Sequence, residues 1–215
     1  MGPFRFIGDH WDSLGPEVVT HIRIPLLAVL MAAVVAVGMG VLGARSSRAD
    51  GVFTAVNSTL LTVPSYALFG IIVFVTGTGD LPVLLGLALY ALLPVQRNTT
   101  AGIQAVRPEV VEAARGMGMG PAQVLTRVEL PLALPVMIAG LRQATVSLVA
   151  ICTVGAKYNS DNLGRPIFDV LRSENLTELT ATVLLIVAIG LVADGLLAGV
   201  QRLLSRGRIT RVQAA

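Results

Sequence analysis

Five apolar stretches, separated by polar segments, constrain what this 215-residue chain can fold into. They cover about residues 22 to 43, 53 to 76, 81 to 95, 130 to 154 and 179 to 203. An α-helix needs about 20 mostly apolar residues to cross the ~30 Å hydrocarbon core of a bilayer. The third stretch is shorter than that, so we expect its helix to extend into the polar residues on either side. The pattern predicts an all-α membrane protein with five transmembrane helices.

The composition supports this fold class, because 54% of the residues are hydrophobic and only 13% are charged. Soluble domains normally carry about a quarter charged residues. Residues 1 to 21 contain three carboxylates and no apolar core with a cleavage site, which excludes a secretory signal peptide. Their aromatic side chains instead predict an extracytoplasmic, amphipathic segment on the membrane surface. At the other end, residues 206 to 215 read as a basic cytoplasmic tail.

The placement of lysine and arginine sets the orientation, because these residues are enriched in cytoplasmic loops. If the N-terminus is outside, ten of the 16 basic residues are cytoplasmic, five are outside and Arg142 lies in the fourth span. The cytoplasmic ten are Arg45, Arg48, Arg97, Arg107, Arg115, Arg127, Arg202, Arg206, Arg208 and Arg211. The bias predicts an N-out, C-in topology.

Several kinds of chemistry are excluded by what the chain lacks. Cys152 is the only cysteine, so no disulfide can form within the chain. The two histidines, His10 and His21, have no second ligand at helical spacing, so we expect no metal site. The phosphate-binding pattern G-x-x-x-x-G-K-[ST] is absent, so the chain itself is not expected to hydrolyse ATP. We expect neither a catalytic site nor a nucleic-acid partner.

A polar insert of small residues between the third and fourth spans has the pattern of two short helices. Pro108 and Glu109 favour a helix start. Glycines at 116, 118 and 120 interrupt this helix, and Pro121 begins a second one that runs into the fourth span. The topology places this insert in the cytoplasm, where a rigid helix next to a transmembrane helix can transmit movement.

The insert also carries a spaced pattern, E-A-A-x(3)-G-x(9)-I-x-L-P, from Glu112 to Pro131, with Val128 in the position of Ile. This pattern resembles the cytoplasmic coupling loop of bacterial ABC-importer permeases. Residues 61–65, 89–99 and 128–144 are similar to permeases of the osmoprotectant branch, which carry glycine betaine, carnitine or choline. The similarity covers about residues 22 to 205.

The resemblance implies a type I ABC-importer (MetI-like) permease fold over residues 22 to 205, with the coupling loop at about 108 to 129. It implies a multi-pass protein of the bacterial inner membrane that forms the pathway for osmoprotectants. Its partners would be two copies of an ATP-binding subunit, which hold ATP and Mg, and a second permease subunit, identical or homologous. An extracytoplasmic substrate-binding protein would complete the importer, and the outer loop over residues 157 to 178, with a predicted short helix, is the candidate surface for it.

The family pattern also implies roles for single residues. Glu112, Ala113, Ala114 and Gly118 would contact the ATP-binding subunit, and Arg115 and Met117 are neighbours of this contact by position. The same architecture carrying an amino acid, methionine or a sulfonate is an alternative. A membrane scaffold or sensor that docks a partner other than an ATPase is a second alternative.

Two sets of residues are candidates inside the membrane. Arg142 lies near mid-depth, and Asp194 is the only carboxylate in a span that is placed to meet it. A charge there needs a partner or a cavity, so the sequence predicts either an ion pair or a residue that lines the pathway.

Tyr66 and Phe69 share a helix face, and aromatic rings attract quaternary ammonium groups. They are candidates to line a path, although packing against other helices is the favoured explanation.

Overall fold

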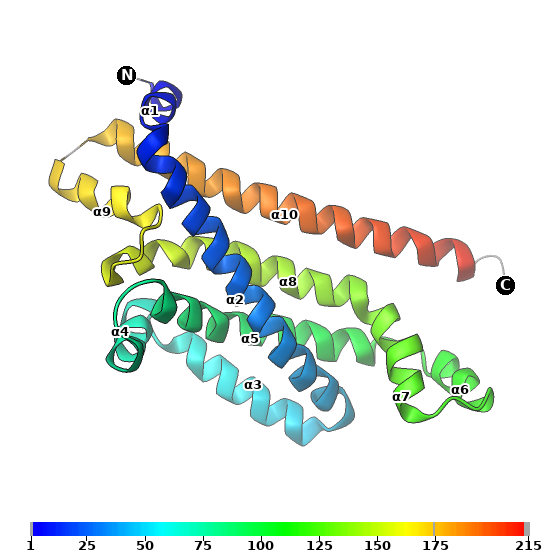
Figure 1. Ribbon diagram of the computed structural model, residues 1–215. Helices are drawn as coiled ribbons and strands as arrows, with labels where there is room; N and C mark the ends of the chain where they lie inside the picture. Colours follow the sequence, from blue (N-terminus) through cyan, green and yellow to red (C-terminus); the bar gives the residue numbers. More distant parts are fainter. Residues whose placement is uncertain (1, 174, 213–215) are drawn as a thin grey trace.

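The computed structural model describes residues 2–173 and 175–212, and every regular element in these ranges is helical. These ranges contain ten α-helices, which Figure 1 labels, and two irregular helical turns on either side of α8. The elements are α1 (Pro3–Asp9), α2 (Trp11–Arg45), α3 (Ser47–Thr62), α4 (Ser65–Thr76), α5 (Asp80–Gln104), α6 (Pro108–Gly116), α7 (Pro121–Val124), the π-helical turn η1 (Leu125–Glu129), α8 (Leu130–Cys152), the 3-10 turn η2 (Thr153–Tyr158), α9 (Gly164–Ser173) and α10 (Leu176–Val212).

Four helical segments of the described chain are long and apolar enough to cross a membrane. They are α2, α5, the continuous segment Pro121–Tyr158 and α10 over Leu176–Ser205. The pair α3 and α4 passes the same test together and makes the count up to five, but these two helices are bent by 98°. The expected second span, over residues 53 to 76, is therefore a broken helix.

The break at Pro64 has a local cause. Proline disfavours the helical conformation in the residue before it, and Val63 is extended, with φ −70° and ψ 127°. The hydroxyl of Tyr90 donates a hydrogen bond of 2.6 Å to the Val63 carbonyl oxygen. This bond satisfies a backbone acceptor that a continuous helix would have paired internally.

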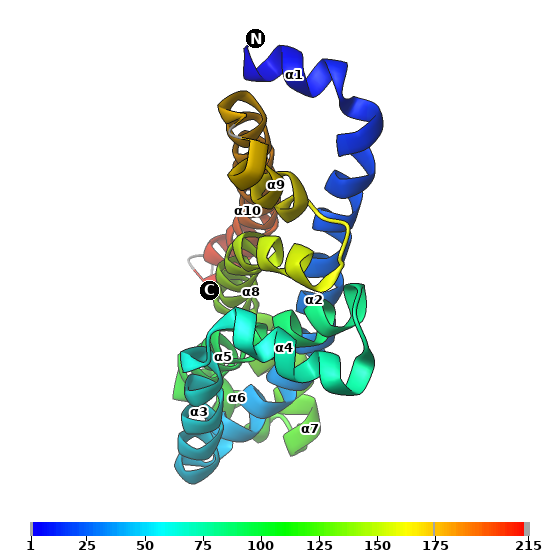
Figure 2. The same ribbon diagram turned by 90° about the vertical axis from the view of Figure 1, so that its left-hand side faces the viewer.

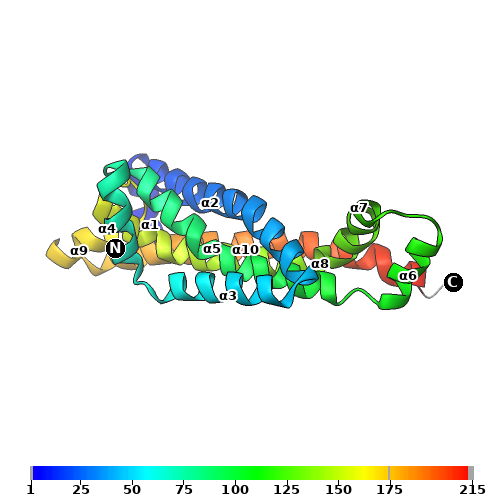
Figure 3. The ribbon, with the colours of Figure 1, turned by 90° about the horizontal axis from the view of Figure 1, so that it is seen from below.

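Helix α5 is the centre of the bundle. It packs against α2 on one side and against α8 on the other, and α8 packs in turn against α10. Figures 2 and 3 show α2 and α3 on opposite sides of α5. Fully buried alanines, Ala28, Ala36 and Ala91, keep the α2 and α5 backbones close. Small residues at such contacts allow helices to associate closely in membranes. Burial of apolar surface alone contributes little free energy to association there, because lipid is also apolar.

As predicted, α5 extends beyond its apolar stretch, and its polar half is buried against α3. Gln96 donates to Asp50 at 3.0 Å and accepts from Asn57 at 3.2 Å. Thr100 donates to the same Asp50 at 3.3 Å. These bonds satisfy polar groups that would be costly to leave unpaired away from water, which is why a polar sequence continues the span.

The elements divide between two ends of the bundle. In Figures 1 and 3, α6 and α7 lie at the end that also carries the C-terminal part of α10, whereas α1, α4 and α9 lie at the opposite end. The first spanning helix begins at Trp11 rather than at about residue 22, so only α1 is separate from it. At the other terminus α10 continues to Val212, and residues 213–215 of the predicted tail lie outside the described residues.

Candidate functional site

The polar insert forms the two-helix arrangement that its sequence predicts. Helix α6 has Pro108 in its first turn and Met117 at its C-cap, and the chain then turns at Gly118, which has φ +83°. This left-handed conformation is readily adopted by glycine and costs other residues about 1–2 kcal/mol. The glycine therefore allows α7 to follow α6 after a short turn.

One side of α6 is anchored and the other is open. Ala114 is only 2% exposed, and its carbonyl oxygen accepts from the Met119 amide at 3.2 Å. By contrast, Glu112, Ala113 and Arg115 are exposed, and Met117 is 72% exposed. The structure thus separates the six candidate contact residues: Ala114 holds the helix to its own chain, and Glu112, Ala113, Arg115, Met117 and Gly118 face outward.

A clamp that the sequence analysis did not identify joins this segment to the first span. Arg45, the last residue of α2, donates from Nη1 to Glu129 Oε1 at 2.9 Å, and its Nη2 donates to Oε2 of the same carboxylate. The Glu129 side chain is only 4% exposed. Two parallel bonds between a guanidinium and a carboxylate fix geometry as well as charge. The start of α8 is therefore held to the C-terminal end of α2.

The element between α7 and α8 is irregular. Residues 125–129 form the π-helical turn η1, and Pro131 follows within the first turn of α8. Such turns are rare in helices and are frequent at functional sites. Here η1 carries Glu129 and joins the short α7 to the spanning helix α8 without a break. The short α7 is thereby continuous with the spanning helix α8.

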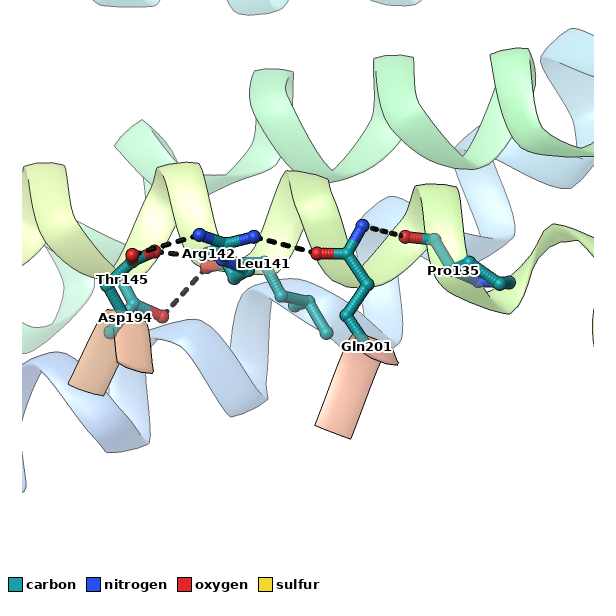
Figure 4. Close-up of polar contacts among 6 residues, drawn as sticks. All are labelled: Pro135, Leu141, Arg142, Thr145, Asp194 and Gln201. Carbon is teal, nitrogen blue, oxygen red and sulfur yellow. Dashed lines mark hydrogen bonds and ion pairs between the residues drawn. The ribbon is translucent and has the colours of Figure 1, made fainter. Parts of the chain in front are cut away.

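The charged residues inside the membrane meet between α8 and α10 (Figure 4). Arg142 donates from Nε and Nη2 to the two oxygens of Asp194, at 2.8 Å and 2.9 Å. Its Nη1 donates to Gln201 Oε1 at 2.8 Å, and the Gln201 amide donates to the Pro135 carbonyl oxygen at 2.8 Å. The Arg142 and Asp194 side chains are 30% and 37% exposed. The structure therefore brings the two charges together and adds a glutamine that the sequence analysis did not identify.

The two aromatic candidates on α4 have different surroundings. Phe69 is fully buried in the core with Leu68 and Leu87, so it cannot line a surface. Tyr66 is exposed, and its carbonyl oxygen accepts a hydrogen bond from the Tyr158 hydroxyl. Phe69 therefore packs in the core, the alternative that the sequence left open, and only Tyr66 is still a candidate to line a path.

The outer end is organised by Asp80 at the start of α5. Arg23 of α2 donates to Asp80 at 2.6 Å, and Ser160 donates to it at 2.8 Å. A helix, α9, lies in the outer loop where one was predicted, and Asn162 caps it by accepting from the Gly164 amide at 2.7 Å. These bonds hold the outer loop to two spanning helices.

The histidines and the cysteine lie apart from these clusters. His21 is buried, with Nε2 3.0 Å from the Val149 carbonyl oxygen, and Cys152 is a buried free thiol. Within residues 2–173 and 175–212, no group of three or more His, Cys, Asp or Glu side chains is arranged to hold a metal ion.

Comparisons with known proteins agree with this arrangement. The chain is 32% identical over 209 residues to the choline transport system permease protein OpuBB of Bacillus subtilis, covering 97% of this chain and 96% of the relative. It is 37% identical over 188 residues to the glycine betaine/carnitine/choline transport system permease protein OpuCD of the same organism, covering 86% and 81%. The fold resembles the MetNI methionine ABC transporter in an inward-facing conformation, with TM-score 0.80 at 17% identity over 91% of this chain and 98% of that one.

The family model described as binding-protein-dependent transport system inner membrane component matches residues 36–209, most of the chain. That range contains the insert with α6 and α7, the Arg45–Glu129 clamp and the Arg142–Asp194 pair. The chain therefore belongs to the family of inner-membrane components of binding-protein-dependent transport systems.

Proposed function

We propose that this chain is the transmembrane subunit of an ATP-driven importer and forms part of the pathway for osmoprotectants such as glycine betaine, carnitine or choline. The two Bacillus relatives are named as transporters of this class of solute, and the chain matches them over 86% or more of its length. Hydrolysis of ATP, with its Mg, belongs to a separate subunit, and this chain needs no cofactor.

The observation that carries the proposal is the exposed face of α6. A short helix lies at one end of the bundle, anchored by a single buried alanine, with a carboxylate, a small residue and a guanidinium presented outward. Such a surface fits a groove on a soluble partner. Because η1 continues into α8 and is clamped to α2, movement of α6 would reach two spanning helices.

The assembly follows from this docking. Two permease subunits, identical or homologous, would enclose the pathway, and two ATP-binding subunits would each hold one α6. A substrate-binding protein would dock at the opposite end, where α9 and the loops around Asp80 lie. Closure of the ATP-binding subunits would move both α6 helices and switch the pathway between outward and inward states.

The test uses the complete transporter, reconstituted in proteoliposomes with its ATP-binding subunits and binding protein. Glu112→Lys reverses an exposed charge on α6, and Gly118→Val places a β-branched side chain at φ +83°. Both variants should insert normally, lose the co-purified ATP-binding subunit and abolish uptake of glycine betaine. Asp12→Lys is the matched control, because it reverses an exposed charge at the opposite end of the bundle.

Full uptake by both α6 variants at normal expression would contradict the docking role. Uptake of an amino acid, methionine or a sulfonate in place of glycine betaine would reassign the solute and keep the architecture. Co-purification of a partner without a phosphate-binding loop would favour a scaffold or sensor instead.

A further inference from the structure

A cavity of about 280 Å³ lies between α3, α5 and α8, away from the clusters described above. Most of its lining surface is apolar, but polar side chains of Tyr90, Arg97, Asn98, Gln143 and Ser147 also border it. We call it the α5–α8 groove, defined by Tyr90, Pro94, Arg97 and Asn98 of α5 and by Gln143 and Ser147 of α8.

The groove lies within the membrane layer. Arg97 is seven residues before the end of α5 at Gln104, which places it ~10 Å inside the helix end. Gln143 and Ser147 are 13 and 17 residues beyond Leu130, or ~20 Å and ~25 Å along α8. Arg97, expected in the cytoplasm from the end of its apolar stretch, is therefore inside the span.

The polar side chains of the groove are open to a ligand. Asn98 donates to the Pro94 carbonyl oxygen at 2.8 Å, which leaves its own amide oxygen without a bond in the described part of the chain. Gln143, Ser147 and Arg97 are exposed and make no hydrogen bond or ion pair within residues 2–173 and 175–212. Polar and charged side chains at membrane depth rarely face lipid, because lipid cannot solvate them. This face is therefore suited to line a water-filled path.

Next to the groove, α5 and α8 make a tight contact at Gly140. A Cβ atom at Gly140 would lie 2.6 Å from the Asn98 Cβ and 2.7 Å from the Pro94 carbonyl oxygen. Only glycine permits this approach of α8 to α5. The contact fixes Asn98 and Pro94, and with them the orientation of the groove wall that carries Arg97.

Arg97 differs from Arg45 and Arg142, because each of those two guanidiniums is paired with a carboxylate. Arg45 is paired with Glu129, and Arg142 is paired with Asp194. No described carboxylate lies within ion-pair distance of Arg97. A guanidinium that faces a cavity without a protein carboxylate is suited to bind a carboxylate from a ligand through two parallel N–H bonds.

The opposite end of the groove suits a quaternary ammonium group. Tyr90 lies on the same face of α5, seven residues before Arg97. It is 6% exposed, so only a small part of its side chain borders the groove, and its hydroxyl is bonded to Val63. The ring is thereby held in place, and an aromatic ring attracts a cation of this kind. Ser147 and Gln143 line the wall between the two ends.

We propose that the α5–α8 groove is a transient binding site for a small zwitterion on the transport pathway, with its carboxylate on Arg97 and its ammonium group toward Tyr90. This inference rests on the proposed function, and it makes Arg97 a specificity-determining residue. A zwitterion gains the Arg97 contact, whereas choline has no carboxylate and meets only a repelling charge. The groove therefore favours glycine betaine and carnitine over choline.

The first experiment compares two solutes in the reconstituted transporter. Arg97→Gln removes the charge and the bidentate geometry while keeping a polar side chain of similar length. Apparent affinity for glycine betaine should fall by about tenfold or more, which is the loss expected for a charged hydrogen bond. Choline uptake should stay constant or rise. Arg97→Lys keeps the charge and should recover part of the glycine betaine affinity.

The second experiment measures access to the groove without using transport. In a Cys152→Ala background, Ser147→Cys and Gln143→Cys should react with a water-soluble thiol reagent, and glycine betaine should slow the reaction more than choline does. Val146→Cys is the matched control, because Val146 is exposed on α8 but lines an apolar pocket with Ile186 and Val187. It should react far more slowly.

The outcomes separate this inference from the proposed function. An equal loss of glycine betaine and choline transport in Arg97→Gln would overturn the carboxylate contact. Failure of both groove cysteines to react, or equal protection by the two solutes, would overturn the site. A wild-type transporter that moves neither solute would contradict the proposed function, and the reactivity of the groove cysteines would still decide whether the groove is an aqueous path.

Discussion

At the scale of single residues, Arg142 and Arg97 show how surroundings decide the role of a guanidinium. Three nitrogen atoms of Arg142 donate to side chains of α10, and the Gln201 amide continues the network to the α8 backbone at Pro135. With these contacts made, Arg142 joins two helices rather than offering its charge to a solute. Arg97 has no such partners in the described chain and faces the α5–α8 groove.

Breaking the Arg142–Asp194 pair should therefore reduce stability more than it changes solute preference. Arg142→Ala and Asp194→Ala should each lower the melting temperature of the purified complex, because each leaves one charge without its main partner. The double variant should lose less than the sum of the two, since contacting residues are not additive. Thermal unfolding of the four forms in the same detergent measures this. Simple additivity of the two losses would mean that the pair contributes nothing in the assembled protein.

The sequence could predict this pair but not the groove, for a physical reason. A charge in an apolar stretch is conspicuous, and only Asp194 was placed to neutralise Arg142. Gln201 carries no charge and gave no comparable signal. Arg97 was missed because its apolar stretch ends near residue 95, while the helix continues to Gln104 on polar contacts with α3. Those contacts depend on tertiary packing, which hydropathy does not report.

At the scale of elements, proline shows the same limit. Pro94 and Pro135 lie inside continuous helices, whereas Pro64 separates α3 from α4. At Pro64, Tyr90 donates to the carbonyl oxygen of the extended Val63 and so stabilises the break. The sequence alone predicted the number of apolar segments but not which proline would break a helix.

The Arg45–Glu129 clamp is the contact that makes α2 and the start of α8 move together. Arg45→Gln should destabilise the protein by about 1–3 kcal/mol, because it leaves a largely buried carboxylate without its charged partner. It should also raise the amount of ATP consumed per solute imported, since movement of α6 and α7 is then less tightly linked to α2. Parallel measurement of ATP hydrolysis and uptake in proteoliposomes gives this ratio.

Arg48→Gln is the matched control, because Arg48 is exposed in the first turn of α3, three residues after Arg45, and makes no ion pair within the described residues. It should leave both stability and the ratio unchanged. A normal ratio in Arg45→Gln would show that the clamp is structural and takes no part in coupling.

At the scale of the whole molecule, the two ends of the bundle differ in charge and in what they present. Arg45, Arg107, Arg115 and Arg127 gather around the α2–α3 turn, α6 and η1, at the end shared with the C-terminal part of α10. The opposite end carries α1, α4, α9 and the loops around Asp80. Because arginine is retained on the cytoplasmic side, the α6 end should be inside the cell.

Cysteine labelling of intact cells tests this orientation. Cys152 is fully buried, and Cys152→Ala provides a background without a thiol. Met117→Cys on α6 and Asp161→Cys beside α9 then place single exposed thiols at the two ends. An impermeant reagent should label Asp161→Cys in intact cells and Met117→Cys only after permeabilisation. The reverse pattern would place α6 outside the cell, where no ATP-binding subunit could reach it, and would overturn the topology and the coupling role together.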